Sequence, residues 1–298
     1  MSIRIGTRGS KLALAQTETV MKKLSALDIP SEKIIINTQG DTTTQVPLHA
    51  IGGQGVFVRA LDDAILANEI DCAVHSMKDI PAYRPHGLFT AAVLKRDSPA
   101  DYIAHNGPLG KVKIIGTSST RRRAQLLRHD PDLTVKDLRG NVDTRIRKLN
   151  EREYDAIILA EAGLTRLGIR LPGERFPPEK FVPSPNQGTI AVVSRADPSL
   201  MEVLSALDHP QTRTDVLIER AVMEQLGGGC YTPLGIYCRA GHLIAEVLSL
   251  DGTRTERIET DVTSIEQARE QGRLLKGKAQ DLIEDACREL GISNEVYP

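Results

Sequence analysis

The sequence has no tryptophan, and aromatic residues make up only 3% of its 298 residues. Apolar residues still make up 40%, so the core must consist of Leu, Ile, Val and Ala, which suits helices packed on sheets. No stretch approaches the roughly 20 apolar residues of a membrane helix, and the first residues, MSIRIGTRGS, hold no apolar signal core. We therefore expect a cytoplasmic protein with no membrane partner.

An excess of charge of either sign is also missing, because the formal net charge is −1. The chain as a whole has no general attraction to nucleic acid or anionic membrane, so a basic site must arise from local clustering. The four cysteines form no CxxC pair, and we expect them to be reduced. No metal-ligand spacing and no dinucleotide-binding fingerprint is found.

Strand-like and helix-like segments alternate along the first half of the chain. The strand IRIGT is followed by a helix from Ser10, the strand KIIIN, a helix through 57–65 and the buried strand DCAVHS. This alternation predicts an α/β fold with mostly parallel sheets. Since 298 residues exceed the roughly 250 that one core can serve, two or three domains are expected.

The order of parts repeats about one domain later. GTRGSKLA at 6–13 corresponds to GTSSTRRRA at 116–124, and EIDCAVHS at 69–76 corresponds to EYDAIILA at 153–160. This repeat predicts two similar α/β domains around a cleft, a common type of ligand site. A Pro-rich connector then precedes the strand TIAVVS, which could return to either domain.

From about residue 212 the pattern changes to a helix, several strands and a long helix ending near 290, which predicts a smaller α+β C-terminal domain. We place domain 1 at 1–92 and 188–206, domain 2 at 93–187, and domain 3 at 207–298.

Each GT segment puts hydroxyl side chains at a strand-to-helix turn, where free backbone N–H groups attract anions. The residues concerned are Thr7, Ser10, Thr117, Ser118 and Ser119. A simpler interpretation makes Ser10 and Ser119 helix N-caps. The two interpretations are compatible.

Arginines gather beside these turns, and a guanidinium binds carboxylate or phosphate with two parallel hydrogen bonds. Several of them at loop ends indicate a polyanionic ligand. The alternative is a solvated basic face, to which we assign Arg123 and Arg128. The clustered arginines are Arg8, Arg121, Arg122, Arg139 and Arg145.

The segment HSMKDIP follows a buried strand, so Lys78 and Asp79 lie where open α/β sheets bind ligands. If it is partly buried, Asp79 could move protons or stabilise a cation, although a turn residue paired with Lys78 explains it equally well. His75 is expected to be a packed or hydrogen-bonded histidine and not a catalyst.

Cys230 follows three glycines and precedes a proline in GGGCYTP, in a loop that needs no apolar side chain. A thiol in such a loop is a candidate nucleophile, whereas the alternative is a buried cysteine after a helix-ending glycine. For Cys72, Cys238 and Cys287, packing is a sufficient explanation.

Seven segments taken together resemble the hydroxymethylbilane synthases, also called porphobilinogen deaminases, in order and spacing from end to end. They are TRGSKLALAQ, GGQGVFVRALDDAIL, HSMKDIP, GTSSTRRRAQL, LRGNVDTRIRKL, AGLTRLG and GGGCYTPLG. The resemblance implies two α/β domains like those of periplasmic binding proteins and a third domain that carries the cysteine.

The resemblance also implies an activity. Cys230 would carry a dipyrromethane cofactor through a thioether, and four porphobilinogen units would join this primer, each losing ammonia. Hydrolysis would then release hydroxymethylbilane for tetrapyrrole biosynthesis. Family members are typically monomers, and the product would pass to a downstream synthase. Because every pyrrole carries an acetate and a propionate, this cargo would need a basic site inside a near-neutral protein.

The family pattern assigns roles to individual residues. Asp79, with Lys78, would be catalytic, assisting the departure of ammonia as an acid and stabilising the azafulvenium cation as a carboxylate. The cofactor-binding residues would be Cys230, Lys78, Asp79, Thr117, Ser118, Ser119, Arg121 and Arg122. The residues for the incoming substrate or growing chain would be Arg8, Ser10, Arg139, Arg145, Arg166 and Gln187. No metal ligand is implied.

The sequence departs from the family pattern in two places. Gln54 stands where the family often has lysine, and SerProAsnGlnGly at 184–188 replaces the usual PAPGQG or PAVGQG, with Gln187 retained. Neither change touches the implied chemistry. Two rival functions stay open. The first is an anion-binding protein without catalysis, which would have no use for Cys230 or Asp79. The second is an RNA-binding protein that uses the segment TRRRAQLLR, although this segment lacks interleaved aromatic residues.

Overall fold

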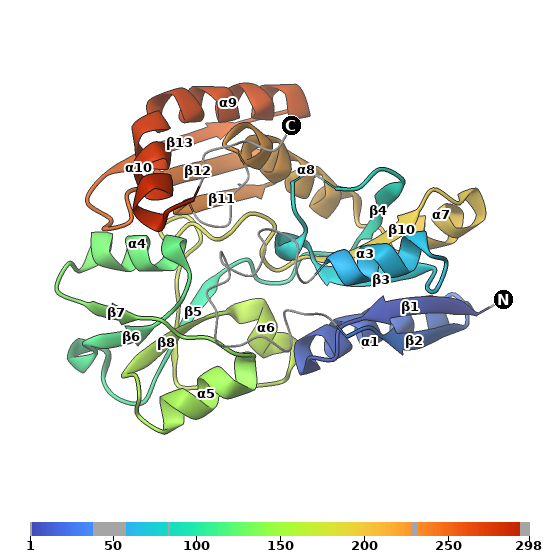
Figure 1. The fold of residues 1–298 in the computed structure, drawn as a ribbon, viewed down its shortest axis with the longest axis horizontal. Coiled ribbons are helices and arrows are strands. Elements are labelled where there is room, and N and C mark those ends of the chain that lie inside the picture. Colours follow the sequence, from blue (N-terminus) through green and yellow to red (C-terminus); the bar gives the residue numbers. More distant parts are fainter. Residues whose placement is uncertain (1, 38–57, 83, 228–231, 293–298) are drawn as a thin grey trace. The chain divides into compact units, whose positions relative to one another are not determined.

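The computed structural model describes residues 2–37, 58–82, 84–227 and 232–292. Gln54 and Cys230 lie outside the described residues. The chain divides into two compact units, of which the first contains Met1–Ser98, Thr165–Gly168 and Gln187–Thr214. The second contains Pro99–Leu164, Ile169–Asn186 and Asp215–Pro298. Figure 1 traces the elements of each unit along the chain.

The first unit is built on a five-stranded mixed sheet with the order β2-β1-β3-β10-β4. Strand β1 pairs in parallel with β2 and β3, whereas β10 runs antiparallel to β3 and β4. Four of the five strands therefore run in one direction, as the prediction of a mostly parallel sheet requires, and only β10, which lies outside the strand-helix alternation, runs the other way. Its strands are β1 (Ile3–Thr7), β2 (Ser31–Ile35), β3 (Cys72–Ser76), β4 (Leu88–Val93) and β10 (Ile190–Arg195).

Helices cover both faces of this sheet. Ile5 packs with Val20 of α1, while the next residue, Gly6, faces Leu61 of α3 from the other side. Ser10 caps α1 as expected, because its Oγ accepts a hydrogen bond from the Ala13 N–H at 3.3 Å. The helical elements are α1 (Lys11–Ser25), α3 (Arg59–Leu66), the 3₁₀ turn η2 (Met77–Asp79) and α7 (Pro198–Ser205).

The second unit contains a sheet of the same design, with the order β7-β6-β8-β5-β9. Strand β6 pairs in parallel with β7 and β8, and β5 runs antiparallel to β8 and β9. Each position matches its counterpart in the first sheet, which confirms the internal repeat. Its strands are β5 (Asp101–His105), β6 (Ile114–Gly116), β7 (Thr134–Lys136), β8 (Ala156–Ala160) and β9 (Gly173–Arg175).

Both faces of the second sheet are also covered. One core cluster joins Ile158 to Leu126 of α4, and the other joins Ile157 to Leu149 of α5. Ser119 caps α4, as expected, through a 3.4 Å hydrogen bond from the Arg122 N–H to its Oγ. The helical elements are η3 (Leu109–Lys111), α4 (Thr120–His129), α5 (Val142–Asn150) and α6 (Glu161–Arg166).

A third, antiparallel sheet with the order β11-β12-β13 follows α8 and confirms the predicted α+β segment. The long helix expected to end near 290 is instead two helices, because the backbone at Ala279 leaves helical angles. Its elements are α8 (Pro210–Gln225), β11 (Leu234–Arg239), β12 (His242–Leu248), β13 (Thr255–Asp261), α9 (Ile265–Lys278) and α10 (Gln280–Leu290). Among the described helices, none is both long and apolar enough to cross a membrane.

Gly188 in the connector before β10 has a φ of +87°, and a Cβ there would lie 2.6 Å from the Ser98 carbonyl oxygen. We expect Gly188→Ala to lower the free energy of unfolding by about 1–3 kcal/mol, because backbone strain and overlap with a carbonyl combine. Thermal unfolding followed by circular dichroism measures the loss. The matched control is Gly168→Ala, which has a positive φ but nothing within 4 Å of its Cβ. A control loss equal to that of Gly188→Ala would contradict this account.

Candidate functional site

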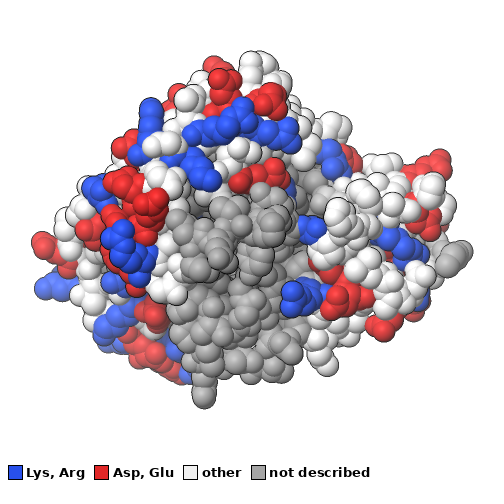
Figure 2. All heavy atoms as spheres, turned by 45° about the horizontal axis from the view of Figure 1, so that its top comes forward, with Lys and Arg blue, Asp and Glu red and all other residues white. Residues whose placement is uncertain are grey.

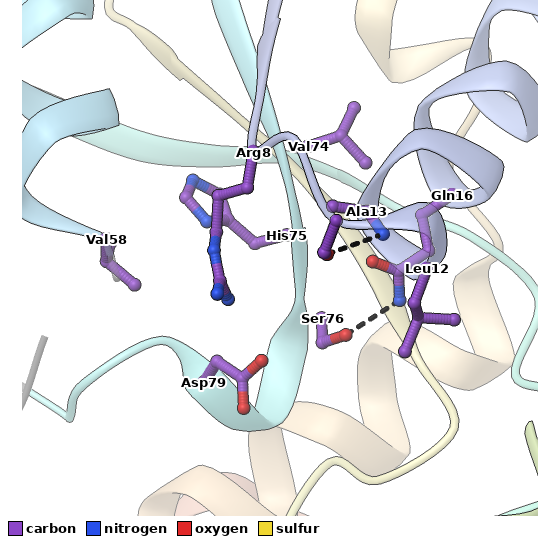
Figure 3. A pocket seen from close by; sticks show the side chains of 10 residues that line it. Arg8, Leu12, Ala13, Gln16, Val58, Val74, His75, Ser76 and Asp79 are labelled. Atoms are coloured by element: carbon purple, nitrogen blue, oxygen red, sulfur yellow. Dashed lines mark hydrogen bonds between the residues drawn. The ribbon is translucent and has the colours of Figure 1, made fainter. Parts of the chain in front are cut away.

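A small cavity of about 60 Å³ lies in the first unit, at the carboxyl ends of β1 and β3. Arg8 and Ser10 reach it from the turn after β1, and Asp79 reaches it from η2, which directly follows β3. Figure 3 shows the Arg8 guanidinium extending toward the Asp79 carboxylate. Three of the predicted site residues therefore share one cavity.

The sheet topology explains why these residues meet. Strands β1 and β3 are parallel neighbours, so the segments that follow them emerge at the same edge. Gln16 of α1 fixes this edge, because its Nε2 donates a 2.7 Å hydrogen bond to the Ser76 Oγ. Asp79 itself is exposed, so it is not the partly buried carboxylate that we considered from the sequence. Its carboxylate is accessible to a ligand.

Lys78 and Gln187, two further predicted site residues of the first unit, are hydrogen-bonded to each other. The Lys78 Nζ donates to the Gln187 Oε1 at 3.2 Å, and the Arg96 Nε donates to the Gln187 backbone carbonyl at 2.8 Å. Gln187 is fully buried. It is therefore held at both its side chain and its backbone, and it holds the Lys78 side chain in turn.

Arg166 is largely occupied by protein groups. Its Nε donates to Asp97 Oδ2 at 2.8 Å, and its Nη2 donates to the Gly188 carbonyl at 2.6 Å. Burial lowers the pKa of Arg166, and the charge of Asp97 opposes that shift. The predicted ligand residue thus lies against the connector before β10, where it ties two loop segments together.

His75 lines the same cavity, and only 5% of its surface is exposed. Its Nε2 has no hydrogen-bond partner among the described residues. Burial, together with the positive charges of Arg84 and Arg8, lowers the pKa of His75 to about 3. Of the two expected alternatives, packed or hydrogen-bonded, the Nε2 side of the ring fits the first, since His75 is a packed, neutral histidine.

This shift predicts a pH dependence of folding. Between pH 6.5, the ordinary pKa of histidine, and about pH 3, the unfolded chain binds a proton at residue 75 that the folded chain does not. The His75 contribution to unfolding free energy should therefore fall by about 1.4 kcal/mol per pH unit as the pH drops through this window. The free energy of unfolding, measured with urea at pH 4.5, 5.5 and 6.5, should change less steeply with pH in His75→Gln than in the wild type. An equal change with pH in both proteins would refute the prediction.

In the second unit, the predicted hydroxyl residues at 117–119 directly precede the first turn of α4. Thr117 is buried, and its Oγ1 accepts from the Ser119 N–H at 3.2 Å. Ser118 bridges to the backbone of Leu138, with both hydrogen bonds 3.0 Å long. The turn is thus well fixed, and the free N–H groups of the first helical turn favour an anion there.

Arg121 and Arg122 are almost fully buried, with 4% and 6% of their surfaces exposed. Both guanidinium groups donate to one carboxylate, that of Asp101 at the start of β5, at 2.8 and 2.7 Å. Sequence reasoning missed Asp101. A signal was present, because the segment PADYIAH places an acidic residue at the start of an otherwise apolar strand.

Arg139 and Arg145 lie near Arg122. The Arg145 Nε donates to the Gly140 carbonyl at 2.8 Å. Burial, with the positive charges of Arg122 and Arg139, lowers the pKa of Arg145 to about 10. Three cations thus act on one another at this place, and a bound anion would relieve their repulsion.

The arginines expected on a solvated face behave differently from each other. Arg123 is exposed and donates to the Val135 carbonyl at 3.2 Å. Arg128 instead donates to the fully buried Glu246 at 3.0 Å, so the expectation is wrong for Arg128. In Figure 2, the described basic and acidic side chains on the visible face are interspersed, consistent with a net charge of −1.

The sequence matches two family descriptions. Residues 3–202 match "Porphobilinogen deaminase, dipyromethane cofactor binding domain", and residues 213–281 match "Porphobilinogen deaminase, C-terminal domain".

Similar curated proteins span nearly the whole chain. A "Probable porphobilinogen deaminase" of Methanosarcina acetivorans is 51% identical, over 96% of this chain and 95% of that protein. The "Porphobilinogen deaminase" of Rubrobacter xylanophilus is 45% identical, over 80% of each. Among solved structures, a periplasmic substrate-binding protein of an ABC transporter from Coxiella burnetii aligns with a TM-score of 0.43 at 15% identity, over 71% of this chain and 94% of that one.

Proposed function

The chain belongs to the porphobilinogen deaminase family, and from this premise we propose that Asp79 is its catalytic carboxylate and Cys230 the attachment point of its cofactor. The family activity is that of a transferase that condenses four porphobilinogen molecules, with loss of ammonia, on a dipyrromethane primer and releases hydroxymethylbilane by hydrolysis. The observation that carries the assignment of Asp79 is the cavity it shares with Arg8 and Ser10.

The residues present fit a dipyrromethane group. This group carries four carboxylates and two pyrrole N–H groups, so it needs several cations or hydroxyl donors and at least one acceptor. In the first unit, Arg8, Ser10 and Lys78 supply donors and Asp79 supplies an acceptor. In the second unit, the three mutually repelling arginines around Arg145 and the first turn of α4 favour anions.

The chemistry of each addition gives Asp79 its role. The bond between the aminomethyl carbon of porphobilinogen and its nitrogen breaks, a carbon–carbon bond forms, and the attacked pyrrole carbon loses its proton. When bound, the dipyrromethane supplies the free pyrrole carbon that accepts the first unit. The Asp79 carboxyl can give a proton to the departing ammonia, and its carboxylate can stabilise the cationic carbon that remains on the substrate.

Neighbouring residues orient the substrate. The Arg8 guanidinium can bind a substrate carboxylate through two hydrogen bonds and hold the reacting carbon beside Asp79. Lys78, held by the buried Gln187, adds a positive charge next to Asp79.

The remaining assignments of the family pattern are also proposals. Thr117, Ser118, Ser119, Arg121 and Arg122 would hold the cofactor, while Arg139, Arg145, Arg166 and Gln187 would serve substrate and growing chain. We further propose three domains (1–92 with 188–206, 93–187 and 207–298), a monomer that works in the cytoplasm, and transfer of the product to a downstream synthase. What supports these proposals is the end-to-end match to the family.

Incubation of the purified protein with porphobilinogen tests the function. The expected result is release of one ammonia for each porphobilinogen consumed, with a linear tetrapyrrole that cyclises and oxidises to a coloured porphyrin after acidification. Binding of porphobilinogen without ammonia release would instead support the anion-binding protein. Binding of RNA in moderate salt would support the RNA-binding protein.

A further inference from the structure

Asp101 is the fully buried first residue of β5, and it pairs with Ala160 at the end of β8. Its carboxylate lies between the two arginines of the first turn of α4. Oδ2 accepts from the Arg121 Nη2 at 2.8 Å, and Oδ1 accepts from the Arg122 Nη2 and Nε at 2.7 and 3.2 Å.

Backbone carbonyls complete the arrangement and fix the plane of each guanidinium. The Arg121 Nη1 donates to the Val182 carbonyl at 2.8 Å, and the Arg122 Nη1 donates to the Ile158 carbonyl at 2.9 Å. A guanidinium held by a carboxylate on one side and a carbonyl on another cannot rotate freely. Its remaining N–H groups therefore point in fixed directions.

The charges of this cluster do not balance as they would in a purely structural ion pair. One carboxylate faces two buried guanidinium groups, and burial lowers the pKa of Arg121. The next acid that acts on Arg121 is Glu246, which is already paired with Arg128 and Arg257. Buried charges without full compensation are costly, so stability alone is a weak reason for a second arginine here.

We propose that Asp101 is a positioning residue, which orients Arg121 and Arg122 toward carboxylates of the bound dipyrromethane and leaves one positive charge for them. The inference rests on the proposed function, because it assumes that these two arginines serve the cofactor. Asp101 would touch neither cofactor nor substrate and would act only through the two guanidinium groups.

The test is Asp101→Asn, purified and compared with wild type for bound cofactor by intact mass and for kcat and KM. We expect the folded variant to carry little adduct and its kcat/KM to fall by roughly 10- to 100-fold, because misplaced ligand groups cost that much. The matched control is Asp71→Asn. Asp71 is also buried between two arginines, Arg4 at 2.8 Å and Arg195 at 3.6 Å, but it lies outside the site. The control should lose stability while keeping its adduct and its KM.

Each outcome is decisive. Normal cofactor loading with kcat/KM within about twofold of wild type would overturn the inference, since misplacement should cost far more. A lower KM would overturn it too, because it would mean that Asp101 only weakens the attraction for anions. If Asp101→Asn does not fold, the test passes to Asp101→Glu, which keeps the charge but moves the carboxylate by one methylene. The same loss of bound cofactor is expected for this variant. A wild-type amount of bound cofactor would contradict the proposal. Absence of both adduct and ammonia release in the wild type would overturn the proposed function itself.

Discussion

Asp79→Asn is expected to reduce turnover by about 10²- to 10⁴-fold, the usual contribution of a positioned acid or base. The amide can neither protonate the departing ammonia nor stabilise the cationic carbon by charge. Because Asp79 is exposed at the end of a 3₁₀ turn, the change should leave the fold and the thermal midpoint nearly unchanged. The measurement is kcat from ammonia release, with cofactor content determined by intact mass on the same sample.

The control for this variant is Asp63→Asn, an acidic residue on α3 that is also exposed. It should turn over like the wild type. Wild-type turnover by Asp79→Asn itself would remove Asp79 from the mechanism. Loss of turnover together with loss of adduct would give Asp79 a role in binding the cofactor instead.

Cys230→Ser is expected to abolish both the covalent adduct and all turnover above background. A thiolate is a far better nucleophile than a serine hydroxyl, which is hardly ionised at neutral pH. Without the attachment, no free pyrrole carbon is held in the site to accept the first unit. Intact mass and ammonia release on the same preparation measure both effects.

Another cysteine provides the control for this variant. Burial raises the pKa of the Cys287 thiol, and Cys287→Ser should keep adduct and activity. Burial raises the pKa of Cys72 to about 12, so that thiol is also a poor nucleophile. An adduct that persists in Cys230→Ser would show that the attachment lies elsewhere.

Much of the fold could be predicted from the sequence, because local patterns determine it. The repeat of GT turns and buried strands predicted two sheets of one design, and the strand orders confirm it. The direction of β10 could not be predicted, since an isolated apolar run does not show from which end it joins a sheet. The helix break at Ala279 could not be predicted either, because alanine favours helix and gives no sign of a helix end.

The candidate site was predictable where residues follow the strand ends of one sheet. Arg8, Ser10 and Asp79 meet in one cavity because β1 and β3 are adjacent and parallel. The sequence could not reveal which guanidinium N–H groups of each arginine are hydrogen-bonded to other groups of the protein. Arg121 and Arg122 depend on Asp101, which lies about 20 positions away and whose role appears only when β5 and α4 pack together.

The most direct test of the whole account is the intact mass of the purified, reduced wild-type protein, followed by peptide mapping. The account predicts extra mass equal to two linked pyrroles, located on the peptide that contains Cys230. A mass equal to that of the bare sequence, unchanged after incubation with porphobilinogen, would contradict it.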